Sequence, residues 1–515
     1  MIKVMKLEEA VALIKDGDTI ATAMAGGVCY PDYLIKGVED QFLATGSPKG
    51  LTKVSGCGHF GDGRFAHPGL MKKFIGAHPG PQAPMIKLIS DNEVEAYGLP
   101  QGIIQQLYRA IAGKQPGILS KIGMGTYIDP RLESGRLNDV SPDCLSEIMQ
   151  IGGEDWLFYK TFPINVALLR GTSSDENGNI TIEEEALKME LLEIALAVKA
   201  NNGKVIVQVK NVVANGSQKA KDVVIPGELV DALVIVEQPE LYHLQTNRTI
   251  YNPFLSGELR APVGAIDPPP AVLEATDIIC RRAAYELFPG AVVNVGLGVG
   301  SGVCSVADVE NMTERVTFTI ELGAFGGSPM GKGDFGASKN PTAFVAHPHM
   351  FDFYHAGGLD AAFLGSAEVD KEGNVNVSRF GEMKGRGQGG FIDISQSAKK
   401  VVFCMNFRSG GLKASVADGK INIAQEGKEG KFVDKVFQIT FSGPLAVEKG
   451  QKIVFVTERG VFELKKEGVT LTEIAPGIDL EKDILSQMHF KPIISKDLKV
   501  MDERIFRPGR MGCFD

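Results

Sequence analysis

The sequence predicts an α/β protein of two related halves, each with an open, largely parallel sheet, and a functional site between them. Short β-branched runs end at glycine turns and are followed by helical patterns, which is the order of elements in a parallel sheet. The same order of helix, turn, strand and glycine-rich loop returns after a Pro-rich segment near the middle of the chain. A crevice between two similar halves is a common place for a ligand.

The bulk composition is that of a globular protein with a large core. The chain has 515 residues, 44% of them hydrophobic and 23% charged, so two large domains or about three average ones are expected. The net charge of −9, without a block of like charge, argues against nucleic-acid binding. The seven cysteines form no C-x-x-C pair, which is typical of reduced thiols in a cytoplasm.

The N-terminal segment and the hydropathy pattern predict a cytoplasmic protein without a membrane anchor. Acids stand at Glu8 and Glu9, where a signal peptide would have its apolar core. No stretch approaches the ~20 apolar residues that are needed to cross a bilayer.

The first half, residues 1–255, alternates predicted helices with predicted strands. Helices are expected at Leu7–Ile14, Tyr33–Val38, Ile103–Ile111 and Glu183–Lys199, and strands at Thr19–Ala23, Leu51–Ser55 and Lys204–Val209. Gly26 and Gly27 follow the first strand, where their N–H groups can face the crevice. Asn177-Gly178 is a strong hairpin signal, which makes the preceding Glu176 a turn residue.

A Pro-rich segment at 256–270 is expected to link this half to a second one at 271–515. In the second half a helix is predicted at Ala271–Leu287, and strands at Ala291–Val295, Val316–Ile320 and Lys399–Cys404. The motif Asp-x-x-Gly-Asn at Asp175–Asn179 recurs at Asp370–Asn374 in the matching place. The repeated order predicts that the two halves are related domains.

Glu321 is the first candidate for chemistry. It ends the strand predicted at Val316–Ile320, and a glycine-dense loop at 323–336 follows it. Sheets of α/β proteins usually bind ligands at the C-terminal edges of their strands. A carboxylate there can cap the strand end or form an ion pair, or it can act as a nucleophile. A second glycine cluster, with Gly389 and Gly390, favours the nucleophile because it offers unhindered N–H groups from the same half.

Two nucleotide-binding motifs are incomplete. Residues 326–332 spell G-x-x-x-x-G-K, but Gly333 replaces the Ser or Thr that holds Mg²⁺, and Pro329 has no N–H for a phosphate. The glycine run at 296–300 lacks the third glycine of a dinucleotide fingerprint. As a tight turn at a strand end, this run can still admit a pyrophosphate-bearing ligand.

No metal site and no serine nucleophile are predicted. His347, His349 and His355 lie close in sequence, but neither an H-E-x-x-H motif nor a Cys/His framework surrounds them. They are expected in packing or at the surface. The chain also lacks the G-x-S-x-G motif of a serine nucleophile.

A set of motifs along essentially the whole chain carries a family resemblance. The motifs are Leu13–Thr19, Pro100–Gly102, Phe162–Gly171 and Asp175–Ile180 in the first half, and Glu321–Pro329, Gly373–Gly381, Gly389–Asp393 and Glu473–Asp479 in the second. Together they resemble the family I coenzyme A transferases, in particular the single-chain propionate/acetate branch. The resemblance implies two related open α/β CoA-transferase domains, with the active site between them and a CoA thioester formed on Glu321.

The implied activity is the transfer of CoA from an acyl-CoA to a free carboxylic acid by a ping-pong mechanism. Neither a metal nor ATP nor a permanent cofactor is expected, since CoA serves as a substrate and as a transient covalent adduct. A homo-oligomer is expected because family members usually form one. The alternatives are an ATP-dependent acyl-CoA synthetase and a CoA-binding protein without catalysis.

Further site residues are expected around the glutamate. Donors to the oxyanions and to the substrate carboxylate are expected at Gly389, Gly390, Gly26, Gly27 and Gln101, and contacts with CoA at Gly296, Gly298, Gly300 and Lys413. Leu322 stands where the branch commonly has a small residue, and Phe325 and Met330 also line the loop. Short-chain acids such as acetate and propionate are the default that the resemblance implies, while Leu322 and Phe325 leave longer or aromatic acids open.

Overall fold

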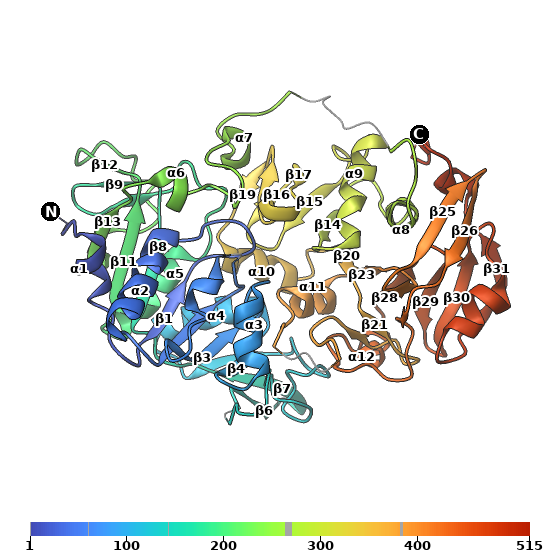
Figure 1. The fold of residues 1–515 in the computed structure, drawn as a ribbon, viewed down its shortest axis with the longest axis horizontal. Coiled ribbons are helices and arrows are strands. Elements are labelled where there is room, and N and C mark those ends of the chain that lie inside the picture. Colours follow the sequence, from blue (N-terminus) through green and yellow to red (C-terminus); the bar gives the residue numbers. More distant parts are fainter. Residues whose placement is uncertain (1, 60, 143, 263–269, 382–384, 515) are drawn as a thin grey trace.

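A computed structural model describes the chain except for residues 1, 60, 143, 263–269, 382–384 and 515. Figure 1 shows two halves side by side, one coloured blue to green and the other yellow to red, each built on a sheet with helices beside it. The predicted α/β fold class is confirmed. Part of the linker expected at 256–270 lies outside the described residues, and the domain boundaries stay a prediction.

The first half contains a seven-stranded sheet in the order β13-β11-β8-β1-β2-β3-β4. All neighbouring strands in it are parallel. The strands are β1 (Thr19–Thr22), β2 (Leu51–Ser55), β3 (Met71–Gly76), β4 (Glu95–Gly98), β8 (Val166–Arg170), β11 (Lys204–Val209) and β13 (Ala232–Ile235). Most are apolar runs, because helices cover both faces of a parallel sheet.

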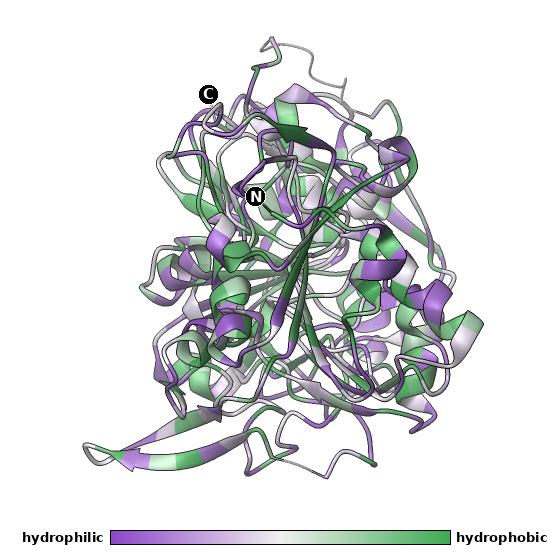
Figure 2. Ribbon diagram, turned by 90° about the vertical axis from the view of Figure 1, so that its left-hand side faces the viewer, coloured by the Kyte–Doolittle hydropathy of each residue, from purple (hydrophilic) through white to green (hydrophobic). Residues whose placement is uncertain are grey.

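The other elements of the first half connect or extend this sheet. The helices are α1 (Leu7–Val11), α2 (Asp32–Thr45), α3 (Ala83–Ser90), α4 (Gln101–Ala112), α5 (Leu191–Ala200), α6 (Pro239–Tyr242) and α7 (Pro253–Ser256). The remaining strands are β5 (Gly117–Ser120), β6 (Ser146–Ile151), β7 (Glu154–Lys160), β9 (Ser173–Asp175), β10 (Ile180–Thr181) and β12 (Asn211–Val213). Strands β6 and β7 lie at the lower edge of Figure 1, where a long two-stranded ribbon projects in Figure 2.

The second half contains a ten-stranded sheet in the order β19-β16-β15-β14-β20-β23-β28-β29-β30-β31. Its central strands, from β15 to β28, are parallel. The strands are β14 (Val292–Val295), β15 (Thr317–Ile320), β16 (Ala324–Phe325), β19 (Ala343–Phe344), β20 (Ala361–Gly365), β23 (Lys400–Cys404), β28 (Lys452–Val456), β29 (Gly460–Lys465), β30 (Gly468–Ile474) and β31 (Ile493–Val500).

Helices and small hairpins complete the second half. The helices are α8 (Ala275–Ala284), α9 (Gly302–Val309), α10 (His347–His355), α11 (Phe391–Ser397) and α12 (Gly443–Glu448). The hairpin strands are β17 (Ser328–Pro329), β18 (Ser338–Lys339), β21 (Glu368–Val369), β22 (Val375–Asn376), β24 (Arg408–Ser409), β25 (Lys413–Ala417), β26 (Lys420–Gln425) and β27 (Glu429–Gly430).

The two halves repeat one arrangement. The order β13-β11-β8-β1-β2 in the first sheet matches β28-β23-β20-β14-β15 in the second, strand for strand along the chain. Both copies of the Asp-x-x-Gly-Asn motif form the same turn, because Asp175 accepts the backbone N–H of Asn179 at 3.0 Å and Asp370 accepts that of Asn374 at 3.0 Å. The hairpin predicted at Asn177-Gly178 is confirmed by the antiparallel pair β9 and β10.

One predicted helix begins later than expected. The pattern predicts a helix over Glu183–Lys199, but α5 begins only at Leu191. The preceding acidic residues are drawn into buried contacts instead: Glu185 with Arg170 at 2.8 Å and Glu190 with His347 at 2.7 Å. These tertiary contacts outweigh the helix propensity of the segment.

The halves share one hydrophobic core, which runs from Ile20 in the first sheet to Phe462 in the second. Figure 2 shows green, hydrophobic strands passing through the interior. Backbone groups also bond across the boundary, since Tyr127 N–H donates to the Ile439 carbonyl at 2.7 Å. The site between the halves is therefore held from both sides. Among the described helices, none has the length and apolar character that a membrane span needs.

A buried arginine holds the C-terminal segment against α8. The guanidinium of Arg281 donates to the carbonyl oxygens of Arg504, Ile505, Arg507 and Gly509 at 2.8 to 2.9 Å. We expect Arg281→Met to lower the free energy of unfolding by about 2–4 kcal/mol, because these carbonyls lose a charged donor. Chemical denaturation measures the loss.

The matched control for this prediction is Arg315→Met. Arg315 is exposed and gives one hydrogen bond to the same segment, at Phe514. Its loss is expected to change stability by less than about 0.5 kcal/mol. Equal effects of the two substitutions would contradict a special role for Arg281.

Candidate active site between the two halves

Glu321 lies at the C-terminal end of β15, as the sequence predicts, and it is only 8% exposed. Asn294, on the neighbouring parallel strand β14, places its side-chain Nδ2 3.4 Å from Oε2 of Glu321. Nδ2 of Asn294 also lies 3.2 Å from the Tyr354 hydroxyl, which in turn lies 2.8 Å from Oγ1 of Thr319. These residues form a buried polar network that contacts the carboxylate of Glu321 through Asn294.

Burial raises the pKa of Glu321 above its usual range. Its own backbone N–H, the Asn294 amide and the nearby His347 ring each act in the opposite direction, and burial outweighs them. The ionised carboxylate is thus poorly solvated. A carboxylate with few hydrogen-bond donors keeps its lone pairs available for attack on a carbonyl carbon.

The loop after Glu321 packs against the first half through glycines. The N–H of Gly27 donates to the Phe335 carbonyl at 3.0 Å, and a Cβ at this position would lie 2.0 Å from the Gly333 carbonyl oxygen. A Cβ at Gly26 would lie 2.8 Å from the Phe335 oxygen. Only glycine permits this approach of two backbones. Gly26 and Gly27 thus join the two halves beside the nucleophile candidate.

The same loop does not form a phosphate cradle. Strand β17, which contains Pro329, pairs in an antiparallel hairpin with β18, whereas a P-loop opens into a helix. The left-handed glycines Gly326 and Gly327, both with φ of 72°, lie against Thr342 and the Lys339 carbonyl. These contacts explain the glycines of the G-x-x-x-x-G-K pattern by packing.

Gly390 lies between two other predicted site residues, Glu321 and Gln101. A Cβ on Gly390 would lie 3.4 Å from Cγ of Glu321 and 3.4 Å from Oε1 of Gln101. Gln101 begins α4 and is fully buried. No acceptor for the Gly390 N–H is found among the described residues. This N–H is therefore available to a ligand.

Three of the expected backbone donors are already engaged. Gly26 N–H donates to the Gly58 carbonyl at 3.3 Å, Gly27 to Phe335 as above, and Gly389 to the Ala77 carbonyl at 3.0 Å. The structure thus corrects the prediction that these N–H groups are free for an oxyanion. These bonds position the loops, and of the four glycines only Gly390 has an N–H without an acceptor among the described residues.

The expected CoA contacts divide into two groups. Gly296, Gly298 and Gly300 form the turn after β14, at the same sheet edge as Glu321. A Cβ on Gly298 would meet nothing within 4 Å, so a ligand can approach the backbone there. Lys413, in contrast, lies on the exposed β25–β26 hairpin. Figure 1 places this hairpin at the outer end of the second half, away from β15. The structure does not bring Lys413 to the site.

The three histidines have different surroundings. His347 lies 2.7 Å from a carboxylate oxygen of Glu190, and His355 lies 3.0 Å from one of Asp393. His349 is exposed. They do not converge on one point.

Sequence reasoning missed the roles of Asn294, Tyr354 and Glu190 at this site. A polar residue within the apolar strand Val292–Val295 is a signal that could have identified Asn294. Glu190 had no local signal, because its partner His347 lies 157 residues further along the chain.

Comparisons with known proteins agree with this arrangement. A family model described as coenzyme A transferase matches residues 4–236. The caffeate CoA-transferase of Acetobacterium woodii is 43% identical over 516 residues, covering 98% of each chain. The acetate CoA-transferase YdiF of Escherichia coli O157:H7 is 40% identical, over 99% of this chain and 96% of the relative.

A solved structure has the same fold from end to end. The apoenzyme of the Escherichia coli O157:H7 acyl-CoA transferase YdiF superposes with a TM-score of 0.92 at 38% identity, covering 99% of this chain and 97% of that chain. A second crystal structure of YdiF, described as a thioester complex with CoA, gives a TM-score of 0.92 at 39% identity. Identity of this extent over the full length shows that the chain belongs to the family I coenzyme A transferases and is an enzyme of the CoA-transferase class.

Proposed function

We propose that this enzyme moves CoA from an acyl-CoA to a free carboxylic acid by a ping-pong mechanism through a glutamyl-CoA thioester on Glu321. The observation that carries the proposal is the buried carboxylate of Glu321, which lies between the halves beside the open N–H of Gly390 and the amide of Gln101. The thioester complex of the YdiF relative supports a covalent CoA intermediate in this family.

The first two steps convert the acyl-CoA thioester into a glutamyl-CoA thioester. A carboxylate oxygen of Glu321 attacks the thioester carbonyl carbon, and the C–S bond then breaks, which releases the CoA thiolate and forms a mixed anhydride between the acyl group and Glu321. The thiolate then attacks the glutamyl carbonyl carbon, and the C–O bond breaks to release the acyl group as a carboxylate. A second acid reverses these steps. The thioester bond energy is kept throughout, so no ATP is required.

Each tetrahedral intermediate places negative charge on an oxygen next to Glu321. The Gly390 N–H is one donor for this charge, and Gln101 supplies an amide at the same point. Donors that are held in place before the reaction stabilise the transition state without reorganisation, and each is typically worth about 10²–10³ in rate.

For the acids that serve as substrates, we propose a chemical class rather than a single compound. Leu322 is buried and lies against Gly336, where a Cβ would be 3.0 Å from its Cδ1, and Phe325 lies edge-on to Phe353 at 5.2 Å. The curated relatives act on acetate and on caffeate by name. We propose a monocarboxylic acid, with short-chain acids as the default and aromatic acids as the alternative. A panel of isotope-labelled acetate, propionate and caffeate as acceptors for CoA from acetyl-CoA distinguishes them.

The covalent intermediate can be tested by intact-protein mass. After incubation with acetyl-CoA and no acceptor acid, the mass is expected to rise by that of one CoA less one water, and added acetate should remove the adduct. Glu321→Ala should give no adduct, because it lacks the carboxylate.

The control for this test is Glu176→Ala, which changes an exposed glutamate in the β9–β10 turn and should keep the adduct. An adduct that persists in Glu321→Ala would place the nucleophile elsewhere. An absolute need for ATP would instead indicate an acyl-CoA synthetase. Tight binding of CoA without transfer of CoA between acids would indicate a CoA-binding protein without catalysis. The homo-oligomer expected from the family also stays a prediction, which light scattering can check.

A further inference from the structure

A chain of three buried side chains crosses from one half to the other beside Glu321. Oε2 of Glu190 lies 2.7 Å from Nδ1 of His347, and Nε2 of His347 lies 2.9 Å from Nε2 of Gln101. All three side chains are fully buried. Glu190 precedes α5, Gln101 begins α4 and His347 begins α10, so two segments of the first half hold one residue of the second.

The hydrogen positions in this chain follow from its chemistry. A carboxylate only accepts, so Nδ1 of His347 carries the hydrogen that Glu190 receives. When the imidazole is neutral, its Nε2 has a lone pair and accepts from the amide nitrogen of Gln101. The amide oxygen of Gln101 then faces Gly390, and it is buried without a partner among the described residues.

The amide oxygen of Gln101 lacks a hydrogen-bond donor in this arrangement. A buried oxygen without a donor costs about 1–3 kcal/mol. The amide of Gln101 can turn round only if Nε2 of His347 also carries a hydrogen, because Nδ1 already donates to Glu190. The turned amide gives its oxygen a donor and directs its NH₂ group towards Glu321, where the transition state needs donors.

We propose that Glu190 and His347 are positioning residues for CoA transfer: Glu190 fixes the ring of His347, and the hydrogen bond at Nε2 of His347 decides which end of the Gln101 amide faces Glu321. With His347 doubly protonated, Gln101 presents N–H groups to the oxyanion, and with His347 neutral it presents an oxygen. The inference rests on the thioester mechanism proposed above. It assigns no covalent role to either residue.

The charges around His347 fit this role. Two carboxylates, Glu190 and Glu321, interact with the ring, and the cation Arg109 on α4 is paired with Asp352 on α10 at 2.8 Å. The other neighbours are neutral: the amide of Gln105 donates to Glu190 at 3.3 Å, and the aromatic ring of Phe351 lies 5.4 Å from the imidazole.

Other ionisable groups lie on the elements that surround these three residues. Burial keeps the Tyr108 hydroxyl on α4 neutral by raising its pKa well above the usual value, and it raises the pKa of the Cys57 thiol, in the segment after β2, to about 12. Asp393 on α11 is paired with His355 at 3.0 Å. His349 on α10 is exposed, and Glu193 on α5 interacts with Glu190 and His349.

Two substitutions of His347 separate positioning from packing. A Gln side chain at this position reaches the place of Nε2 and can bond with Gln101, whereas an Asn side chain reaches the place of Nδ1 and can bond only with Glu190. In single-turnover formation of the CoA adduct from acetyl-CoA, we expect His347→Gln to remain within about 10-fold of wild type and His347→Asn to be slower by about 10²-fold. Gln101→Met should match His347→Asn. His349→Gln, on the same helix but exposed, is the control and should react like wild type.

Substitution of Glu190 tests the other end of the chain. Glu190→Gln keeps an acceptor for Nδ1 of His347, so adduct formation should remain within about 10-fold of wild type, whereas Glu190→Leu removes this acceptor and should slow the reaction by about 10²-fold.

Two results would overturn the inference: equal slowing of His347→Gln and His347→Asn, or equal rates of Glu190→Gln and Glu190→Leu. Both are read at unchanged melting temperature, so that misfolding is recognised. Absence of any adduct in the wild-type enzyme would contradict the proposed function itself. Adduct formation that is unaffected by the variants would contradict only the role of Glu190 and His347.

Discussion

Glu321→Gln is expected to abolish CoA transfer while it stabilises the fold at neutral pH. The amide cannot attack a thioester, and removal of a covalent nucleophile typically costs about 10⁴-fold or more in rate. The side chain keeps its size beside Gly390 and its contact with Asn294. Steady-state transfer from acetyl-CoA to propionate measures the loss.

The gain in stability follows from the sign of the pKa shift. Burial raises the pKa of Glu321 in the folded protein above its usual value of 4.5. Above the raised pKa the carboxylate is ionised in both states, and the folded state bears the cost of its desolvation. Below pH 4.5 the group is protonated in both states, and the cost disappears. We therefore expect Glu321→Gln to add about 0.5–2 kcal/mol at pH 7 and nothing at pH 4.

A second buried glutamate provides the matched control. Glu310 is 1% exposed, and its carboxylate accepts the backbone N–H of Gly512 at 2.9 Å as well as that of Met511. Glu310→Gln replaces one of two acceptor oxygens with a donor and should destabilise the protein at pH 7. If Glu321→Gln also destabilised the protein, the carboxylate would be satisfied in the fold rather than held for reaction.

The sequence predicts the location of this site better than the roles of the residues that surround Glu321. Glu321 could be found because an acid at the end of a buried strand is a local pattern. Gly26 and Gly27 were expected at the right place with the wrong role, since a glycine that admits a second backbone looks the same in sequence as one that admits a ligand. Their N–H groups bond to Gly58 and Phe335, and Phe335 lies in the other half.

Contacts between distant residues account for the other differences. The pair of Glu190 and His347 joins positions 157 residues apart, so no spacing in the sequence reveals it. The same contact withdraws Glu190 from the helix that its neighbours predict. The sequence predicts a contact between Lys413 and CoA, but this lysine lies on an exposed hairpin of the second half. Charge alone did not indicate its distance from the site.

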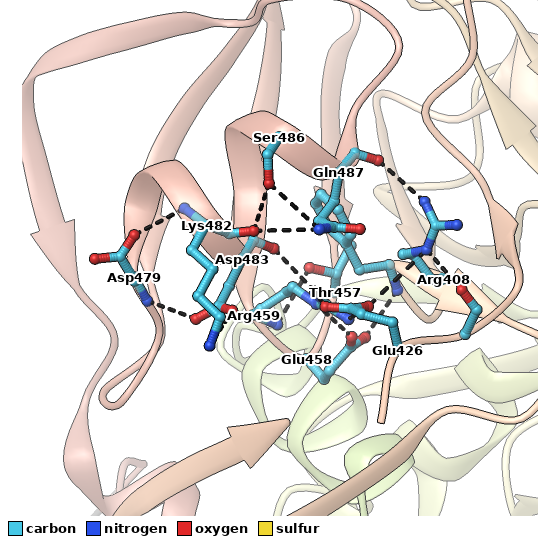
Figure 3. Close-up of polar contacts among 12 residues, drawn as sticks. Arg408, Glu426, Thr457, Glu458, Arg459, Asp479, Lys482, Asp483, Ser486 and Gln487 are labelled. Atoms are coloured by element: carbon cyan, nitrogen blue, oxygen red, sulfur yellow. Dashed lines mark hydrogen bonds and ion pairs between the residues drawn. The ribbon is translucent and has the colours of Figure 1, made fainter. Parts of the chain in front are cut away.

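Arg459→Met is expected to cost about 3–5 kcal/mol of stability, because it leaves a buried carboxylate without its cation. Arg459 is fully buried, and its Nε lies 2.9 Å from Oε1 of Glu458, which is also fully buried. The guanidinium also bonds with Glu426 at 2.9 and 3.0 Å and with the Asp483 carbonyl at 2.9 Å, as Figure 3 shows. Its carbon lies 4.7 Å from the centre of the Phe407 ring. Hydrogen exchange of the β28 and β29 amides measures the loss locally.

A double substitution distinguishes this cause from a loss of packing. A buried ion pair that is replaced by apolar residues of similar volume is often neutral or stabilising, whereas breaking one partner is costly. Arg459→Met with Glu458→Leu should therefore recover part of the stability that Arg459→Met loses, although the N–H of Phe407 then lacks its acceptor at 2.8 Å. Lys482→Met, at an exposed side chain in the same close-up, should change stability by less than about 0.5 kcal/mol. If the double variant were less stable than Arg459→Met alone, the uncompensated charge of Glu458 would not be the cause, and the packing of the arginine against Phe407 would account for the loss.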